Sequence, residues 1–223
     1  GKTVIRRRRA ATRYANRTVA GRALADELVD AAFDKPVVLA LPRGGVPIAA
    51  EVAARLNAQL GVILVRKIGV PGRSELAMGA LAMVGGEIAE FRNEEIINGL
   101  RISSQAFEAA RDRERLELER RASIFPSADL DIADATVILA DDGLATGSTM
   151  LAAVAAVRTH APAAVVVAVP VGARQAVQVL RSIAHRVVCL SSPEPFIAVG
   201  GAYEDFRQLS DEEVLSILKE FSS

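Results

Sequence analysis

The stretch from Thr136 to Met150, which reads TVILADDGLATGSTM, constrains the fold of this chain more than any other. It passes from apolar, partly β-branched residues into two adjacent acids, then into a loop of small and hydroxyl-bearing residues, and finally into an alanine-rich segment. That order predicts a buried strand, a loop and a helix of an α/β protein. In open α/β sheets, ligands bind beyond the carboxyl ends of the strands, which is where Asp141 and Asp142 fall.

The loop after the two acids has the chemistry of a phosphate-binding site. Its glycines give the backbone freedom, its hydroxyls and N–H groups are donors, and the start of the following helix carries about half a positive charge. Acids would repel a phosphate, so we expect the acid pair to reach a diol or a metal-bridged oxygen beside it. A sugar phosphate meets both demands. The residues that we expect to bind it are Asp141, Asp142, Gly143, Ala145, Thr146, Gly147, Ser148 and Thr149.

Two other interpretations of this stretch are open. An ordinary strand, turn and helix with solvated acids would place the same residues in the same order. A nucleotide-binding P-loop would need the pattern G-x-x-x-x-G-K-[ST]. The Gly-Lys-Thr of this chain, at Gly1–Thr3, has no loop before it, which argues against a P-loop.

The sequence DDGLATGST, preceded by an apolar strand, closely resembles the motif by which type I phosphoribosyltransferases bind phosphoribosyl pyrophosphate (PRPP). In that family the acid pair binds the ribose 2- and 3-hydroxyls, and the loop binds the 5-phosphate. The resemblance implies transfer of the 5-phosphoribosyl group from Mg-PRPP to a nitrogenous base, with release of pyrophosphate. It implies Mg²⁺ as the cofactor, held mainly by PRPP and water and not directly by the protein, with Asp141 and Asp142 nearby.

A second strand, loop and helix precede this one. Val37–Leu41 has the pattern of a short buried strand, Ile48–Leu56 that of a helix, and the loop between them contains PRGGVP. Glycines flanked by prolines indicate a tight turn, and a purely structural turn is the alternative to a ligand loop. The resemblance implies that this loop binds the pyrophosphate through Arg43, Gly44 and Gly45.

A third strand, Gly61–Val65, is expected to end at two adjacent cations, Arg66 and Lys67. Neighbouring positive charges repel each other, so we expect a polyanion between them, and the leaving pyrophosphate would supply one. A solvated pair of surface cations is the alternative.

The segment Ile68–Ala80 contains three glycines and has little periodicity, which predicts a mobile loop. In the resembled family a flexible loop at this place closes over the reaction centre and excludes water. Its closing contacts would come from Arg73, Ser74 and Glu75. The candidate catalytic residues are Arg66, Lys67 and Glu75.

The remaining pattern predicts a doubly wound, mainly parallel α/β sheet, because apolar strands alternate with amphipathic helices. With 223 residues and 51% hydrophobic content, the chain can bury one sizeable core. A hairpin, Leu81–Val84 with Ile88–Phe91, is expected at the sheet edge, and an exposed, charged helix at Ser103–Ser123. Other expected helices lie at Thr18–Phe33, Met150–Thr159 and Ala173–Ile183, and other strands at Val137–Ala140, Ala163–Val169 and Arg186–Leu190.

The end of the chain departs from this alternation and resembles a small hood. The stretch FIAVGGAYEDFRQL is similar to a shortened hood of the purine-type members, and Ser210 is expected to cap a final helix. The resemblance places Phe196 near a nucleobase ring; an aromatic packed on the sheet is the alternative. The residues assigned to the base are Phe196, Ala198 and Val199. The domains are a basic N-terminal arm, 1–13, a phosphoribosyltransferase core, 14–192, and a hood with the C-terminal helix, 193–223.

One position departs from the family's pattern. Members that act on 6-oxopurines carry an acid where this loop has Ala145. We therefore expect an adenine-like, pyrimidine-like or unusual acceptor, and not hypoxanthine or guanine. Neither histidine is expected to replace the missing acid. His160 follows a predicted helix and His185 precedes a predicted strand, so we expect both to be surface groups.

The net charge is zero, from 27 basic and 27 acidic residues, so no long-range field would gather nucleic acid. The basic run Arg6–Arg9 nevertheless leaves open a PRPP-sensing regulator that binds nucleic acid, and a non-catalytic PRPP- or nucleotide-binding protein is a further alternative. A single cysteine, Cys189, excludes an intrachain disulfide and favours a cytoplasmic location. The longest apolar stretch, Ala161–Ala173, is too short to cross a membrane. We expect PRPP and a small-molecule base as partners, and a homo-oligomer in nucleotide salvage.

Overall fold

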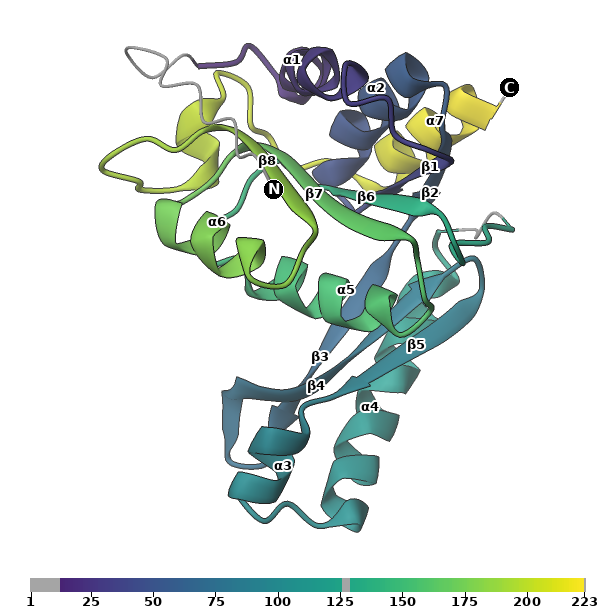
Figure 1. Cartoon of the computed structure of the whole chain (residues 1–223), viewed down its shortest axis with the longest axis vertical. Coiled ribbons are helices and arrows are strands. Elements are labelled where there is room, and N and C mark those ends of the chain that lie inside the picture. The colour runs from purple at the N-terminus through teal and green to yellow at the C-terminus, as the bar shows by residue number, and fades with distance from the viewer. Residues whose placement is uncertain (1–12, 126–128, 223) are drawn as a thin grey trace.

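The computed structural model describes residues 13–125 and 129–222, so the basic run at Arg6–Arg9 lies outside the described residues. Within these ranges the chain forms a five-stranded parallel sheet and a three-stranded antiparallel sheet, with helices between and around them (Figure 1). The predicted α/β class with a mainly parallel sheet is confirmed. None of the helices in these ranges is long and apolar enough to cross a bilayer.

The parallel sheet has the strand order β2-β1-β6-β7-β8. Its strands are β1 (Pro36–Ala40), β2 (Gln59–Val62), β6 (Thr136–Ala140), β7 (Ala164–Val171) and β8 (Arg186–Ser191). β1 and β6 lie side by side, with Ala40 opposite Ala140 at their carboxyl ends. Because parallel neighbours end at the same edge, the two predicted ligand loops leave the sheet next to each other.

Helices cover both faces of the parallel sheet (Figure 1). They are α1 (Arg17–Val29), α2 (Gly45–Leu56) and α7 (Asp211–Ser222) on one face, and α5 (Ser148–Arg158) and α6 (Arg174–Arg181) on the other. Alternate strand residues supply the two cores: Val38 and Ile138 pack towards the first set of helices, Val37 and Val137 towards the second. The doubly wound arrangement is therefore confirmed.

The antiparallel sheet follows β2 directly and carries two helices of its own. Its elements are β3 (Leu64–Val70), β4 (Arg73–Val84), β5 (Glu87–Arg92), α3 (Glu94–Gly99) and α4 (Ser104–Ala122). α4 packs against β3 and β4, and α5 of the parallel layer packs against all three strands. The predicted hairpin of β4 and β5 is present with its turn at Gly85 and Gly86, but it belongs to this separate sheet and not to the edge of the parallel one.

The predicted mobile loop at residues 68–80 is wrong, because these residues form a hairpin of β3 and β4. The chain turns at Pro71 and Gly72, and Gly72 has a positive φ of 77°. Gly79 lies inside β4, where a Cβ would stand 2.6 Å from the Phe91 carbonyl oxygen. The glycine at this position thus permits close strand approach, a use that the sequence does not distinguish from mobility.

Arg66 and Lys67 do not end a strand of the parallel sheet, as the sequence predicted. That strand ends at Val62, and the two cations lie within β3, paired with Leu81 and Ala80 of β4. Side chains of successive strand residues point to opposite faces. The two charges are therefore separated by the strand itself and do not need a shared polyanion.

The C-terminal segment contains a short 3-10 helix, η1 (Val199–Ala202), and then α7. The Glu213 N–H donates to Ser210 Oγ at 3.1 Å, and the Ser210 N–H donates back to Glu213 Oε1 at 3.4 Å. This reciprocal pair confirms the predicted cap of the final helix. Because α7 packs against α2, the last helix lies on the core (Figure 1). Its Asp211 lies near Arg43 of the loop that contains Gly44.

Candidate functional site

The acid pair lies at the carboxyl end of β6, and its two members have different surroundings. Arg17 Nε donates to Asp142 Oδ2 at 3.0 Å, and the Asp142 N–H donates to Asp141 Oδ1 at 2.8 Å. Burial raises the pKa of the Asp141 carboxyl well above its usual range, and the charge of Asp142 raises it further. Asp141 therefore favours a ligand that brings hydroxyl donors or positive charge.

The second loop packs directly onto these acids. A Cβ on Gly44 would stand 2.1 Å from Asp142 Oδ2, and a Cβ on Gly45 would stand 2.7 Å from the Ala140 carbonyl oxygen. No side chain fits at either position, so both glycines are needed for the approach of the two loops. The peptide between Pro42 and Arg43 is cis. The structure thus brings the two predicted ligand loops together into one site.

The loop of residues 143–149 opens onto the amino end of α5. Gly147 precedes the helix with a φ of 76°, and Thr146 Oγ1 accepts from the Ser148 N–H at 3.3 Å. The first turn of α5 carries no acid, so its partial positive charge is not neutralised there. Exposed residues of the loop are Ala145, Thr146, Ser148 and Thr149, whereas Gly143 and Gly147 are buried. This arrangement suits an anion.

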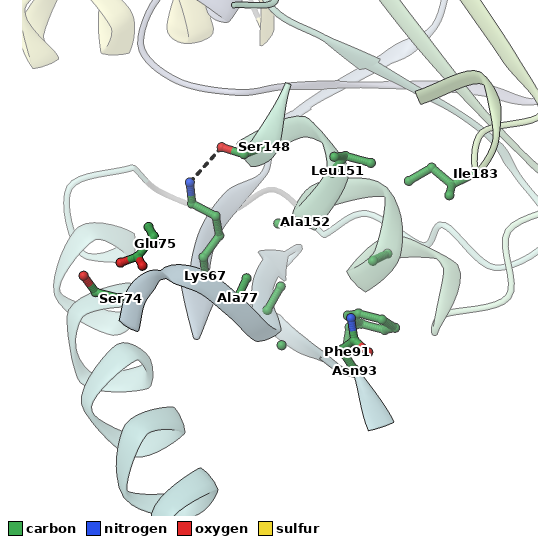
Figure 2. Close-up of a pocket in the computed structure, with 13 residues that line it drawn as sticks. Lys67, Ser74, Glu75, Ala77, Phe91, Asn93, Ser148, Leu151, Ala152 and Ile183 are labelled. Atoms are coloured by element: carbon green, nitrogen blue, oxygen red, sulfur yellow. Dashed lines mark hydrogen bonds between the residues drawn. The ribbon is translucent and has the colours of Figure 1, made fainter. Parts of the chain in front are cut away.

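Lys67 reaches this loop from the antiparallel sheet. Its Nζ donates to Ser148 Oγ at 2.9 Å, across the space between β3 and α5 (Figure 2). The sequence assigned Lys67 to the pyrophosphate, whereas the structure places it at the loop assigned to the 5-phosphate. An ammonium group and a helix terminus at one point make a strong anion site.

The other two predicted cations are paired with acids. Arg66 Nε donates to Glu114 Oε2 of α4 at 2.7 Å, and Arg43 Nη1 lies 3.7 Å from Asp211 Oδ1 of α7. Both pairs are partly exposed, and the second is long, so their contribution to stability is only about 0–1 kcal/mol each. Arg43 can leave Asp211 for an incoming anion at little cost.

Arg121 of α4 joins this group, although nothing in the sequence pattern pointed to it. Burial lowers the pKa of its guanidinium, and the positive charges of Arg66 and Arg43 lower it further. The mutual repulsion of three guanidinium groups is relieved when an anion binds among them. Arg121 was missed because it looks like one more charged residue of an exposed helix.

A cavity of about 440 Å³ lies between α5 and the antiparallel sheet. Ser74 and Glu75 lie at one end of it, beside Lys67 and Ser148, and Phe91 lies at the other end (Figure 2). Ser74 and Glu75, two of the three residues predicted to close the site, therefore lie towards the loop of residues 143–149, which we call the phosphate loop after its predicted role. The third, Arg73, does not line this cavity. The remaining lining residues are Ala77, Gly79, Ala80, Asn93, Leu151, Ala152, Ala155 and Ile183.

The predicted base-binding segment touches the loop at one point. A Cβ on Gly143 would stand 2.5 Å from Val199 Cγ1, so Val199 packs directly on the phosphate loop. Phe196 is half-buried against the core, and Ala198 is exposed. The neighbouring Ile197 is 89% exposed.

Two further residues hold Asp142 in place and were not found from the sequence. They are Arg17, already described, and Tyr203, whose hydroxyl donates to the Asp142 carbonyl oxygen at 2.6 Å. Tyr203 is only 1% exposed. Both lie far from Asp142 in the chain, and no local pattern links them.

The donor set fits a magnesium ion that arrives with its ligand. In the described ranges, no group of three or more His, Cys, Asp and Glu side chains could hold a metal ion. The half-buried Asp141 carboxylate nevertheless favours nearby positive charge. A Mg²⁺ held by phosphate oxygens and water would meet that demand.

The comparisons with known proteins show which family this chain is similar to. The phosphoribosyl transferase domain family matches residues 12–206. A provisionally assigned phosphoribosyl transferase of Mycobacterium tuberculosis is 40% identical over 207 residues, which make up 92% of this chain and 46% of that protein. The chain thus spans about half the length of this curated relative. The crystal structure of the Thermus thermophilus protein TT1426 superposes with a TM-score of 0.81 at 42% identity, over 94% of this chain and 99% of that one.

Proposed function

The chain belongs to the phosphoribosyltransferase family, and on that premise we propose that it transfers the 5-phosphoribosyl group of Mg-PRPP to a nitrogenous base and releases pyrophosphate. The observation that carries the proposal is the contact of Gly44 and Gly45 with the end of β6 and its acid pair. One loop for a pyrophosphate and one for a sugar phosphate are side by side, as a bound PRPP requires.

In this proposal PRPP, the phosphoribosyl donor, occupies three adjoining places. Asp141 and Asp142 bind the ribose hydroxyls, and residues 143–149 bind the 5-phosphate at the amino end of α5. Lys67, hydrogen-bonded to Ser148, adds a charge at the 5-phosphate. The loop of Arg43, Gly44 and Gly45 binds the pyrophosphate, with Arg66 and Arg121 near Arg43.

The reaction needs positioning and charge stabilisation and no covalent catalyst. A nitrogen of the base attacks C1 as the bond to pyrophosphate breaks, through an oxocarbenium-like state. The acid pair stabilises the positive charge that develops on the ribose, and the arginines stabilise the negative charge that develops on the leaving group. Bound with PRPP, Mg²⁺ would neutralise part of the pyrophosphate charge. Arg66, Lys67 and Glu75 are the proposed catalytic residues.

The acceptor is proposed to be adenine-like, pyrimidine-like or unusual, because Ala145 leaves the loop without an acid. It would lie near Phe196, Ala198 and Val199, and the contact of Val199 with Gly143 supports this place. Only the first part of the segment 193–223 would then serve as the hood, because its last part, α7, packs on α2 in the core. A cytoplasmic homo-oligomer that acts in nucleotide salvage completes the proposal.

Non-catalytic binding of PRPP is the second candidate. The ion pair Arg66–Glu114 favours it, because it occupies a cation that would otherwise stabilise the leaving pyrophosphate. A PRPP-sensing regulator would use such binding together with the basic run at Arg6–Arg9.

Isotopically labelled PRPP, incubated with Mg²⁺ and a panel of bases, tests the proposal. We expect labelled nucleotide and pyrophosphate with a base other than hypoxanthine or guanine, and no product from an Asp141→Asn variant. Calorimetric binding of PRPP without turnover would support the second candidate. If PRPP neither binds nor reacts, the proposal fails.

A further inference from the structure

Arg17 is the first residue of α1, yet its side chain lies at the acid pair, 125 residues away in the chain. Its Nε donates to Asp142 Oδ2 at 3.0 Å, and the two side chains are only 10% and 15% exposed. An ion pair this deep is held in one geometry, because neither group can exchange its partner for water without a large movement.

Three contacts fix the guanidinium of Arg17. Besides Asp142, its Nη1 donates to the Arg207 carbonyl oxygen at 2.9 Å, and its plane lies over the Phe206 ring, 4.2 Å from the ring centroid. Phe206 in turn stacks on Tyr203, with ring centroids 5.1 Å apart. The segment 203–207 therefore binds the planar guanidinium in one position, and an ammonium group could not make the same contacts.

Asp142 is held from two more sides. The Tyr203 hydroxyl donates to its carbonyl oxygen at 2.6 Å, and burial raises the pKa of this hydroxyl, so that it stays a donor. Gly44 closes the third side, where even a methyl group would collide with Asp142 Oδ2. The backbone and one carboxylate oxygen of Asp142 are thus fixed by α1, by the segment 203–207 and by the pyrophosphate loop.

From this geometry we propose that Arg17 is a positioning residue, which holds the carboxylate of Asp142 in one orientation so that the acid pair meets the ribose hydroxyls already in place. The inference rests on the proposed binding of PRPP. Arg17 takes Oδ2 and leaves Oδ1 as the acceptor for a hydroxyl. The second acid is thereby neutralised from within the protein, whereas Asp141 depends on the ligand.

The energetic reason lies in preorganisation. A carboxylate that is free to rotate must be ordered when the ligand binds, and this cost reduces the affinity. With Arg17 in place the carboxylate of Asp142 is already ordered on folding. Affinity for PRPP should therefore depend on a residue that does not touch it.

Calorimetric titration of Mg-PRPP into an Arg17→Gln variant tests this role. We expect about a tenfold or greater loss of affinity at neutral pH, because one bound charge partner is lost. A purely structural role would lower the melting temperature without lowering the affinity of the folded variant for Mg-PRPP.

Matched variants complete the test. Arg22→Gln, which removes an exposed arginine of the same helix paired with Glu51, should leave affinity within about twofold of wild type. In an Asp142→Asn background, Arg17→Gln should cause no further loss, since both charges of the pair are then absent. Equal losses in the two backgrounds, or an Arg17→Gln variant with unchanged affinity, would overturn the proposal.

If Arg17→Gln does not fold, a Phe206→Leu variant tests the positioning role of Arg17 instead. It keeps the ion pair but removes the ring below the guanidinium, and we expect about a threefold loss of affinity. Unchanged affinity in this variant would overturn the proposal. If the wild-type protein itself does not bind Mg-PRPP, the proposed function fails, which is a different result from tight binding that is insensitive to Arg17.

Discussion

Lys67 Nζ of β3 donates a hydrogen bond to Ser148 Oγ, the first residue of α5, at 2.9 Å. This contact joins the antiparallel sheet to the phosphate loop of the parallel sheet (Figure 2). On the proposed function, a cation that the sequence assigns to the pyrophosphate would therefore lie at the loop proposed to bind the 5-phosphate. The distinction has a measurable consequence.

A Lys67→Met variant should bind PRPP about 10- to 100-fold more weakly, because a hydrogen bond to a charged group contributes roughly 1.5–3 kcal/mol. Affinity for ribose 5-phosphate should fall in the same proportion, and affinity for pyrophosphate much less. Calorimetry with the three ligands measures this. Lys219→Met, on the exposed part of α7, is the control, and a larger loss for pyrophosphate than for ribose 5-phosphate would contradict the assignment.

Gly44→Ala should destabilise the fold by about 1–3 kcal/mol and reduce PRPP affinity, because its Cβ would stand 2.1 Å from Asp142 Oδ2. Thermal unfolding followed by circular dichroism, with and without PRPP, measures both effects. Gly99→Ala is the matched control, since a Cβ there meets nothing within 4 Å. The contact is disproved if the two variants melt at the same temperature.

Asp141→Asn should make the protein more stable at neutral pH while weakening PRPP binding. The pKa of Asp141 is raised in the folded state, so the folded protein binds the proton more tightly than the unfolded chain does. Stability from this group is therefore present at low pH, below the ordinary aspartate pKa, and is lost as the pH rises through the raised value. The asparagine variant does not suffer this loss.

Melting temperatures across the pH range measure the effect. Near neutral pH, the Asp141→Asn variant should melt about 2–4 °C above wild type for each 1 kcal/mol of stability that ionisation of Asp141 costs the wild type. Near about pH 4 the two proteins should melt at the same temperature. Parallel curves for the two proteins would show that burial of Asp141 carries no such penalty.

Ser210→Ala should lower stability by about 1 kcal/mol and leave PRPP affinity unchanged. Ser210 caps α7 through the Glu213 N–H, and its hydroxyl hydrogen-bonds with Glu213 and not with a residue of the ligand loops. Chemical denaturation gives the free energy of unfolding, and Ser216→Ala, an exposed serine of the same helix, is the control. Equal unfolding free energies for the two variants would contradict the role of the cap.

The two strand, loop and helix units of residues 36–56 and 136–158 could be predicted because their signals are local. Each has an apolar strand of five residues, a glycine-containing loop and a helix with apolar spacing, and each appears in the structure within a few residues of the predicted bounds. Their parallel alternation also predicted the sheet. What brings the two loops into contact is the pairing of β1 with β6, which places Gly44 on Asp142.

The antiparallel sheet could not be predicted, because one continuous strand and two successive strands of different sheets have the same local apolar pattern. β2 and β3 are separated only by Ile63, so one apolar run contains strands of two sheets. Glycines of the following hairpin indicated a loop, although Gly79 serves the packing of β4 against β5. The change of sheet is set by tertiary packing of α4 and α5 on these strands.

The partner of Asp142 could not be predicted for a different reason. Arg17 belongs to a stretch of basic residues near the start of the chain, and its burial depends on Phe206 and Arg207 near the end. A pairing across 125 residues leaves no spacing or periodicity to detect. The acids of the site were visible in the sequence, whereas the groups that orient them were not.

A calorimetric comparison of Mg-PRPP, ribose 5-phosphate and pyrophosphate as ligands of the wild-type protein tests most directly whether the two loops form one site. If the acid pair, the phosphate loop and the Gly44 loop act together, linking the two fragments should make PRPP at least about 100-fold tighter than either alone. Substitution of Asp141 should then remove most of that advantage. An affinity for PRPP no greater than that for pyrophosphate would contradict a single shared site.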